Sequence, residues 1–385
     1  MSDNVIELHK IQPSRKRIIW LGIAVFAVVL ILLVILFPEV LNLDAVGRFF
    51  RYGSDRKDES YGRVSFDAHS SNRYALWSEG LALTSVGGVE IYEEEGRRTV
   101  QKAAPLSAPA IAAGQNVTLC YDIGGDTVLA YKNGTEAVME TEIDGILLDA
   151  DISSGDAICT AASESGHKTV LRVYDKNQQE VYRWFSASRF MPFCAVSQSA
   201  RHMAAIGLGQ KDGSFCSTLY FFRTDTEEPL HSVDLGGRLV YDLKFLGENR
   251  ICVMCEDGLF IYDVDGTEHG SYSLASWYLE DFDLSGDGFA AFSLNMYKAG
   301  DRCSVVTVDH QGKELGSLFV GAEILDISAC GKYLAVLTTE KLMILHKDLS
   351  EYVVCENQWM ATSALMRNDG TVYLISGGTA ELYIP

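Results

Sequence analysis

Apolar and polar residues alternate in short runs over most of the chain. Beyond residue 63, runs rich in Val, Ile, Leu, Tyr and Phe are separated by clusters of Gly, Asp, Asn and Ser, without a helical period. Period-two alternation bounded by turn residues is typical of β-strands joined by tight turns. The pattern predicts an all-β domain over residues 62–385.

Two turn patterns recur in alternation, typified by "DISACGKYLAVL" (326–337) and "LFIYDVDGTEHG" (259–270). Repeats of a unit of about 40 residues with four short strands are typical of propeller blades. The equivalent strands of the second pattern begin at this spacing, near Val89, Val128, Val170, Leu219, Leu259, Val305, Leu342 and Leu382. We therefore predict a β-propeller.

The two ends of the repeat region predict how the ring closes. The last unit, residues 361–385, has room for three strands, and "GRVSFDAH" (62–69) precedes the first complete unit and can supply the fourth. This arrangement gives eight blades. Seven blades are the alternative, because "YALWSEG" (74–80) marks the first inner strand weakly.

One segment near the N-terminus has a different pattern. Residues 18–37 are apolar without a charge, and at 1.5 Å per residue about 20 residues match the ~30 Å hydrocarbon core of a bilayer. The sequence predicts a transmembrane helix at 18–37 that acts as a signal anchor. Residues 1–17 would then be a basic cytoplasmic tail, and the polar, glycine-flanked residues 38–61 a stalk or linker.

Charge sets the predicted orientation and excludes one class of partner. Lys10, Arg15, Lys16 and Arg17 precede the apolar run, and the positive-inside rule then predicts a cytoplasmic N-terminus and an extracytoplasmic propeller on the cell membrane. The net charge of −20 argues against nucleic acid as a partner, because phosphates need a basic surface.

The Asp-x-Asp-Gly stretches raise the question of a calcium site. A calcium loop needs a bidentate acid at its twelfth position. Counting from Asp263 that residue is Leu274, and counting from Asp281 in "DFDLSGDG" it is Phe292. We interpret both stretches as hairpin turns, in which Asp and Gly tolerate left-handed backbone angles.

Nine cysteines offer a second candidate chemistry. Cys252 and Cys255 form a Cys-x-x-Cys pair in "RICVMCEDG". On a strand, residues three apart point to opposite faces, and no second pair stands at zinc-ligand spacing. The sequence therefore predicts buried, unpaired thiols at these two positions.

Aromatic residues gather at two predicted blade junctions. They are Trp184, Phe185, Phe190 and Phe193 at one, and Trp277 and Tyr278 at the other. Such junctions lie near one rim of a propeller. They can form a recognition patch, but packing between blades is the favoured interpretation.

The sequence contains no nucleophile elbow, phosphate loop or zinc-protease motif, and the histidines are scattered singly. We therefore assign no catalytic, cofactor-binding or metal-binding residue and predict no cofactor. The predicted function is a non-enzymatic interaction scaffold for a protein of the cell envelope or membrane. The alternative is a small-ligand sensor or enzyme that uses the central channel.

The two repeated stretches resemble the diverged blades of WD40-like and quinoprotein-like propellers, although the Gly-His and Trp-Asp pairs of WD40 repeats are missing. A basic tail, one apolar segment, a stalk and a propeller together are similar to an uncharacterised clostridial family of single-span, membrane-anchored propellers with a domain of unknown function. The resemblance implies an extracytoplasmic location and no established activity.

Overall fold

A computed structural model describes residue 28 and residues 43–53, 61–78, 80–298, 300, 302–357 and 360–385. The chain divides into two compact units, Met1–Asp55 and Arg56–Pro385. Helix α2 (Leu43–Tyr52) belongs to the first unit. It lies within the segment that the sequence predicted to be a stalk.

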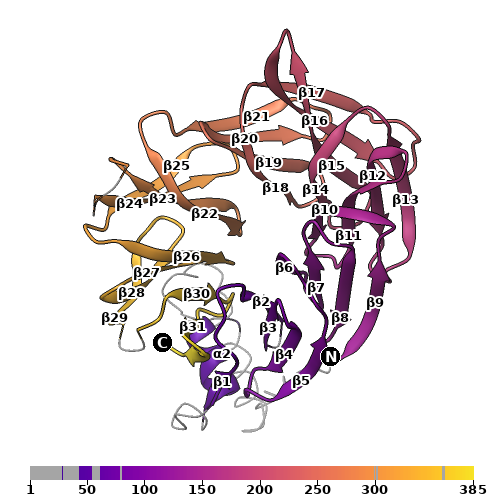
Figure 1. Cartoon of the computed structure of the whole chain (residues 1–385). Helices are drawn as coiled ribbons and strands as arrows, with labels where there is room; N and C mark the ends of the chain where they lie inside the picture. The colour runs from indigo at the N-terminus through magenta and orange to yellow at the C-terminus, as the bar shows by residue number, and fades with distance from the viewer. Residues whose placement is uncertain are drawn as a thin grey trace, which may run out of the picture. The chain divides into compact units, whose positions relative to one another are not determined.

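The second unit is a ring of eight four-stranded antiparallel sheets (Figure 1). The strands of the first four blades, from the innermost to the outermost, have the following bounds. Blade 1 contains β2 (Arg73–Trp77), β3 (Gly80–Ser85), β4 (Gly88–Glu93) and β5 (Arg98–Ala103). Blade 2 contains β6 (Pro109–Ala113), β7 (Val117–Asp122), β8 (Thr127–Lys132) and β9 (Glu136–Glu142). Blade 3 contains β10 (Gly145–Ile152), β11 (Ile158–Glu164), β12 (His167–Tyr174) and β13 (Glu180–Ser186). Blade 4 contains β14 (Phe190–Val196), β15 (His202–Lys211), β16 (Ser214–Arg223) and β17 (His231–Gly236).

The other four blades complete the ring. Blade 5 contains β18 (Val240–Leu246), β19 (Arg250–Cys255), β20 (Gly258–Asp263) and β21 (Glu268–Ser273). Blade 6 contains β22 (Tyr278–Gly286), β23 (Phe289–Asn295), β24 (Cys303–Asp309) and β25 (Glu314–Phe319). Blade 7 contains β26 (Ile324–Cys330), β27 (Tyr333–Thr338), β28 (Lys341–His346) and β29 (Glu351–Glu356). Blade 8 contains β30 (Ser363–Met366), β31 (Val372–Ser376), β32 (Thr379–Tyr383) and β1 (Val64–Ser65).

The hydrophobic core lies between the blades. In the described part of the chain, each pair of neighbouring blades encloses one cluster of buried apolar side chains. Strands such as β19 are buried on both faces: Val253 packs toward blade 4 and Met254 toward blade 6. This two-sided burial explains why the second strand of most blades is a continuous apolar run.

The predicted ring closure is confirmed. Strand β1 pairs antiparallel with β32, with Val64 opposite Ala380, and so becomes the outer strand of blade 8. The Phe66 amide extends this pairing by donating a hydrogen bond to the Gly378 carbonyl at 2.9 Å. Eight blades are therefore correct, and the alternative of seven is wrong.

One part of the predicted fold class is corrected. The predicted transmembrane helix at 18–37 and the tail at 1–17 lie outside the described residues, apart from Val28. No helix in the described segments is long and apolar enough to cross a membrane. Helix α2 has ten residues, among them Asp44, Arg48 and Arg51, and at 1.5 Å per residue it is about half as long as a bilayer core is thick.

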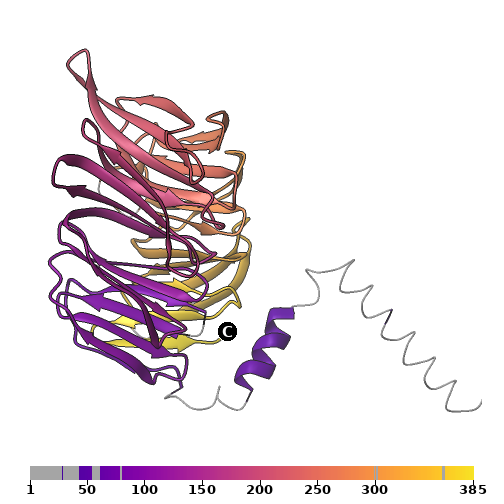
Figure 2. The ribbon, with the colours of Figure 1, turned by 90° about the vertical axis from the view of Figure 1, so that its right-hand side faces the viewer.

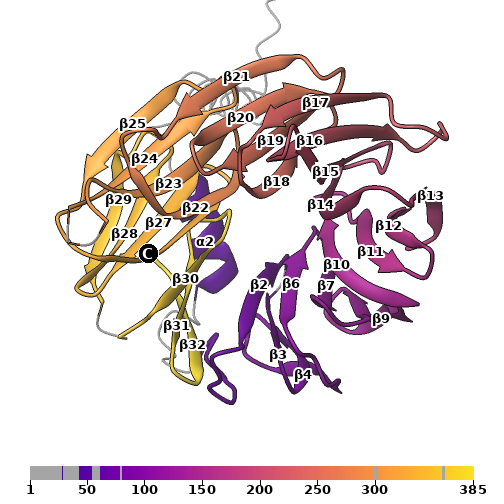
Figure 3. The same cartoon turned by 45° about the horizontal axis from the view of Figure 1, so that its top comes forward.

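The strand order gives the propeller two different faces, which Figure 2 shows from the side. We call one the turn face: it carries the turns between the first and second strands and between the third and fourth strands of each blade. We call the other the loop face: it carries the connections into each inner strand and the turns between second and third strands. The longest of these hairpins, β15–β16, has ten residues in each strand and projects from the ring (Figure 3).

Candidate functional site

Exposed apolar side chains are concentrated on the loop face. Among the described residues of the propeller, the large apolar side chains classed as exposed on this face are Val86, Ile123, Ile146, Phe185, Phe190, Phe215, Leu239, Tyr241, Tyr278, Met296, Tyr297, Phe319 and Met360. The exceptions, Val181 and Val354, lie on outer strands. No turn of the turn face carries one in the described segments. Single exposed apolar residues are ordinary, but this one-sided distribution marks the loop face as a candidate interaction surface.

Several of the exposed residues on this surface are aromatic. We use the name aromatic arc for Phe185, Phe190, Phe215, Tyr241 and Tyr278, which come from the consecutive blades 3 to 6. Their exposed fractions range from 40% for Phe190 to 51% for Tyr278. Each lies at or near the end of a strand, where the chain reaches the loop face, so the sheet no longer covers it.

The predicted aromatic junctions divide between packing and exposure. Trp184 is buried against Phe222, with ring centroids 5.1 Å apart. Phe193 and Trp277 pack at the edges of blade-interface clusters. Phe185, Phe190 and Tyr278 are exposed. Period-two alternation explains the division, because Trp184 and Phe185 are neighbours on one strand and must point to opposite sides.

The centre of the ring carries carboxylates at matching positions of several inner strands. They are Asp149 and Asp151 on β10, Asp242 on β18, Asp281 and Asp283 on β22, and Asp326 on β26. Lys244, two residues after Asp242, donates to the Ser285 hydroxyl at 2.7 Å. Asp281 and Asp283 lie within the inner strand β22 (Tyr278–Gly286). The sequence interpretation of their stretch as a turn is therefore wrong for these two residues.

Most of these carboxylates hold the next blade in place. The amides of Cys194 and Val196 donate to Asp149 and Asp151, at 2.9 and 3.2 Å. Ile327 and Ala329 donate in the same way to Asp281 and Asp283, and Ala364 to Asp326. An inner strand is the edge of its own sheet, so its outward amides need acceptors from elsewhere.

Burial raises the pKa values of several of these acids, namely Asp149, Asp151, Asp242, Asp281 and Asp326. Desolvation raises the pKa of Asp149 to about 7, with smaller contributions from Asp151 and Asp242. Desolvation is also the main cause that raises the pKa values of Asp242 and Asp326 to about 6. Asp151 adds to the shift of Asp242 although the two belong to blades 3 and 5. Burial therefore favours the protonated forms of Asp149, Asp242 and Asp326 over those of ordinary aspartates.

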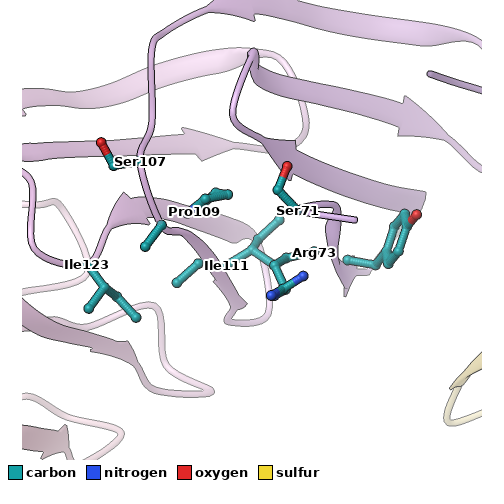
Figure 4. A pocket seen from close by; sticks show the side chains of 9 residues that line it. Ser71, Arg73, Ser107, Pro109, Ile111 and Ile123 are labelled. Atoms are coloured by element: carbon teal, nitrogen blue, oxygen red, sulfur yellow. The ribbon is translucent and has the colours of Figure 1, made fainter. Parts of the chain in front are cut away.

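A cavity opens on the loop face between the inner strands of blades 1 and 2, and Figure 4 shows its lining. Its volume is about 500 Å³. It is lined by Ser71, Arg73, Tyr74, Ser107, Ala108, Pro109, Ala110, Ile111 and Ile123. No sequence motif marks it, because its two walls come from different blades.

The other sequence candidates are structural. The amide of Gly266 donates to the Asp263 carbonyl at 2.9 Å, and Gly266 has a φ of 81°, so the stretch at Asp263 is the predicted hairpin turn. The Asp263 carboxylate pairs with Arg250 at 3.0 Å. Cys252 packs toward blade 6 and Cys255 toward blade 4, which confirms that they point to opposite faces of β19.

Comparison with solved structures supports the fold. The C-terminal WD40 domain of Sif2 aligns with 84% of this chain and 97% of its own, with a TM-score of 0.56 and 11% sequence identity. BamB from Moraxella catarrhalis aligns with 83% of this chain and 95% of its own, with a TM-score of 0.49 and 18% identity. The likeness to the Sif2 domain, at 11% identity, shows a common propeller fold and nothing further.

Sequence comparison gives the family. No curated protein matches the chain in sequence. Residues 51–358 match the model of a family of unknown function, DUF5711, which includes blades 1 to 7 and the strand β1 that closes blade 8. The predicted resemblance to a WD40-like family of unknown function is thereby confirmed, whereas a clostridial source and a single membrane span are not among these findings. The chain belongs to the DUF5711 family.

Proposed function

We propose that the protein is a non-enzymatic scaffold whose loop face binds a partner protein of the cell envelope. The one-sided distribution of exposed apolar side chains carries this proposal. Ordered interfaces between proteins are enriched in Tyr, Trp, Phe and Met at their centres. The aromatic arc provides such residues on a rigid ring, so binding would order few additional groups and lose little conformational entropy.

The centre of the ring supports the scaffold over an enzyme that uses the channel. Asp149, Asp151, Asp281, Asp283 and Asp326 each accept a backbone amide from the following blade. A catalytic acid or base must reach a substrate with its carboxylate oxygens. One oxygen of each carboxylate instead accepts a hydrogen bond from the next blade, which favours a structural role.

Crosslinking in cells tests the proposed face. The full chain would carry a photoreactive residue at Leu239, which lies between β17 and β18 within the aromatic arc's stretch of the loop face. We expect one dominant crosslinked partner. The double substitution Phe190→Ser and Tyr278→Ser should reduce its yield at least tenfold. The matched control is Val181→Ser with Val354→Ser, two exposed apolar positions on outer strands, which should leave the yield unchanged.

Two results would contradict the proposed interaction face. An equal loss in both double variants would mean that removing exposed apolar area anywhere lowers the yield, and would contradict the proposed face. Equal crosslinking of the partner to the unsubstituted protein and to both double variants would contradict it as well. Melting temperatures of the three proteins serve as the folding control.

The proposal includes an extracytoplasmic location, in line with the cations that precede residue 18. A reporter enzyme that is active only outside the cytoplasm, fused after Pro385, should be active. Activity of a reporter that works only in the cytoplasm, fused at the same position, would contradict this part of the proposal.

A further inference from the structure

Arg73 has no acidic partner among the residues that the structure describes, although the protein is strongly acidic. The chain has a net charge of −20, and many of its exposed arginines pair with a carboxylate, as Arg97, Arg183 and Arg223 do. In the described part of the chain, Arg73 forms no ion pair. Its Nη1 donates to the carbonyls of Ser70 and Asn72, at 3.2 and 2.9 Å.

These two hydrogen bonds hold the guanidinium in one orientation. They occupy Nη1 only, so the edge formed by Nε and Nη2 has no partner among the described residues. This edge presents two parallel N–H groups at the spacing of the two oxygens of a carboxylate. Arg73 is therefore oriented for a bidentate contact that no described residue makes.

The cavity beside Arg73 defines what else a ligand needs. Figure 4 shows Arg73 next to Ile111, with Pro109 and Ile123 along the same cavity. Ile123 is 44% exposed and stands at the turn between β7 and β8. The amide of Ala108 donates to the buried carboxylate of Asp122 at 2.6 Å, which fixes the wall that begins at Pro109. The Ser107 hydroxyl also lines the cavity and has no hydrogen-bond partner within the described segments.

We propose that this cavity binds a monoanionic carboxylate that carries a small apolar group. Arg73 would hold the carboxylate through Nε and Nη2, and Pro109, Ile111 and Ile123 would cover the apolar group. A phosphate or sulfate dianion fits less well, because Arg73 is the one cationic side chain in the lining and the net charge repels a second negative charge. The volume of about 500 Å³ is in the range of small-ligand sites.

Such a ligand can be a free carboxylic acid or the C-terminal residue of a polypeptide. The inference goes beyond the proposed scaffold and stands whether or not the aromatic arc binds a protein. The cavity lies on the loop face, so a polypeptide terminus could reach it. Both sources share the same chemistry at Arg73.

Calorimetric titration of the full chain tests the site. The probes are N-acetyl-leucine, its amide, and a tetrapeptide that ends in leucine with a free carboxylate, each at up to about 10 mM. We expect saturable binding of the two acids and at least tenfold weaker binding of the amide. Tighter binding of the tetrapeptide would assign the site to polypeptide termini, and equal binding of both acids would assign it to free acids.

Substitutions of Arg73 test whether binding depends on the paired N–H groups of its guanidinium. Arg73→Gln should weaken the acids at least tenfold, and Arg73→Lys should restore less than half of the loss in binding free energy, because lysine keeps the charge and lacks the planar fork. Arg183→Gln, at an arginine already paired with Glu180, is the matched control and should not change the affinity. Unchanged melting temperatures would show that the variants are folded. Equal affinity for acid and amide, no saturable binding of either acid, or an unaffected Arg73→Gln variant would overturn the proposal.

Discussion

Arg367 and Glu94 form a buried ion pair that joins the last blade to the first. Nη2 of Arg367 lies 3.1 Å from Oε2 of Glu94, and their side chains are 7% and 6% exposed. The two residues are 273 positions apart in the sequence. Their contact lies on the turn face, next to the pairing of β1 with β32. The ring is therefore closed by a charge pair as well as by backbone hydrogen bonds.

Removing one partner of this pair should destabilise the propeller strongly. We expect Arg367→Ala to lower the free energy of unfolding by about 3–5 kcal/mol, because the buried Glu94 carboxylate would lose the Arg367 guanidinium. The control is Arg183→Ala, which breaks an exposed pair with Glu180 and should cost less than about 1 kcal/mol. Denaturant unfolding of the full chain measures both. Similar losses in the two variants would contradict the structural importance of the buried pair.

A second prediction concerns β1. Val64 is fully buried in the cluster between blades 8 and 1. Val64→Asp would place a charge in this cluster and should cost more than about 3 kcal/mol and promote aggregation. Val181→Asp changes an exposed valine on an outer strand and should have little effect. The melting temperature and the soluble fraction decide. If Val64→Asp behaved like the control, closure through β1 would be wrong.

The raised pKa of Asp149 at the centre of the ring predicts that its contribution to stability decreases as the pH rises. The pKa of Asp149 rises from 3.8 to about 7 on folding, so the folded state holds this proton more tightly than the unfolded state. Its contribution to stability is fully present below about pH 4 and is lost as the pH rises through about 7. Asp149→Asn keeps an acceptor for the Cys194 amide and removes the charge. It should stabilise the protein on the order of 2 kcal/mol at pH 8 and little at pH 4.

Melting curves between pH 4 and pH 8 check this difference. The control is Asp212→Asn at the exposed turn between β15 and β16, whose curve should run parallel to that of the unmodified protein. An Asp149→Asn curve that is also parallel would contradict the raised pKa.

The cysteines give a fourth prediction. Cys159 and Cys194 belong to blades 3 and 4, and their sulfur atoms lie 3.4 Å apart in a buried contact. Cys252 and Cys255 point to opposite faces of β19. An oxidant is added while the protein unfolds, the protein is refolded, and its disulfides are mapped by mass spectrometry. The refolded fraction should contain a Cys159–Cys194 bond and no Cys252–Cys255 bond. A Cys252–Cys255 bond in refolded protein would contradict the described strand.

The repeat pattern was sufficient to predict the ring. Each of the eight equivalent positions, from Val89 to Leu382, lies in the third strand of its blade. The prediction works because a strand buried on both sides leaves a continuous apolar run, and the turns beside it need Gly, Asp or Asn. Helix α2 was missed although its residues are amphipathic, because it is only ten residues long, contains Gly47 and lies in a segment interpreted as a polar linker.

The candidate sites were less accessible to sequence reasoning for a physical reason. Both recurring turn patterns belong to the turn face, so the repeat describes that face and leaves the loop face irregular. Arg73 and Ile123 line one cavity from two blades, and no local motif links them. The sequence did show aromatic residues at strand starts, such as Phe190. They could be separated from packing residues only when the faces of each strand were known.

Closure through β1 has a consequence for how the protein is made. Its partner β32 is synthesised roughly 300 residues after β1, which at about 5–20 residues per second leaves β1 waiting on the order of 15–60 s. Blades 1 to 7 can pack one against the next as they emerge, but the first side of blade 1, with Leu81 and Tyr92, stays uncovered throughout. During this interval the seam between first and last blades is the place where a chaperone would be needed and where a second nascent chain could insert its own strand.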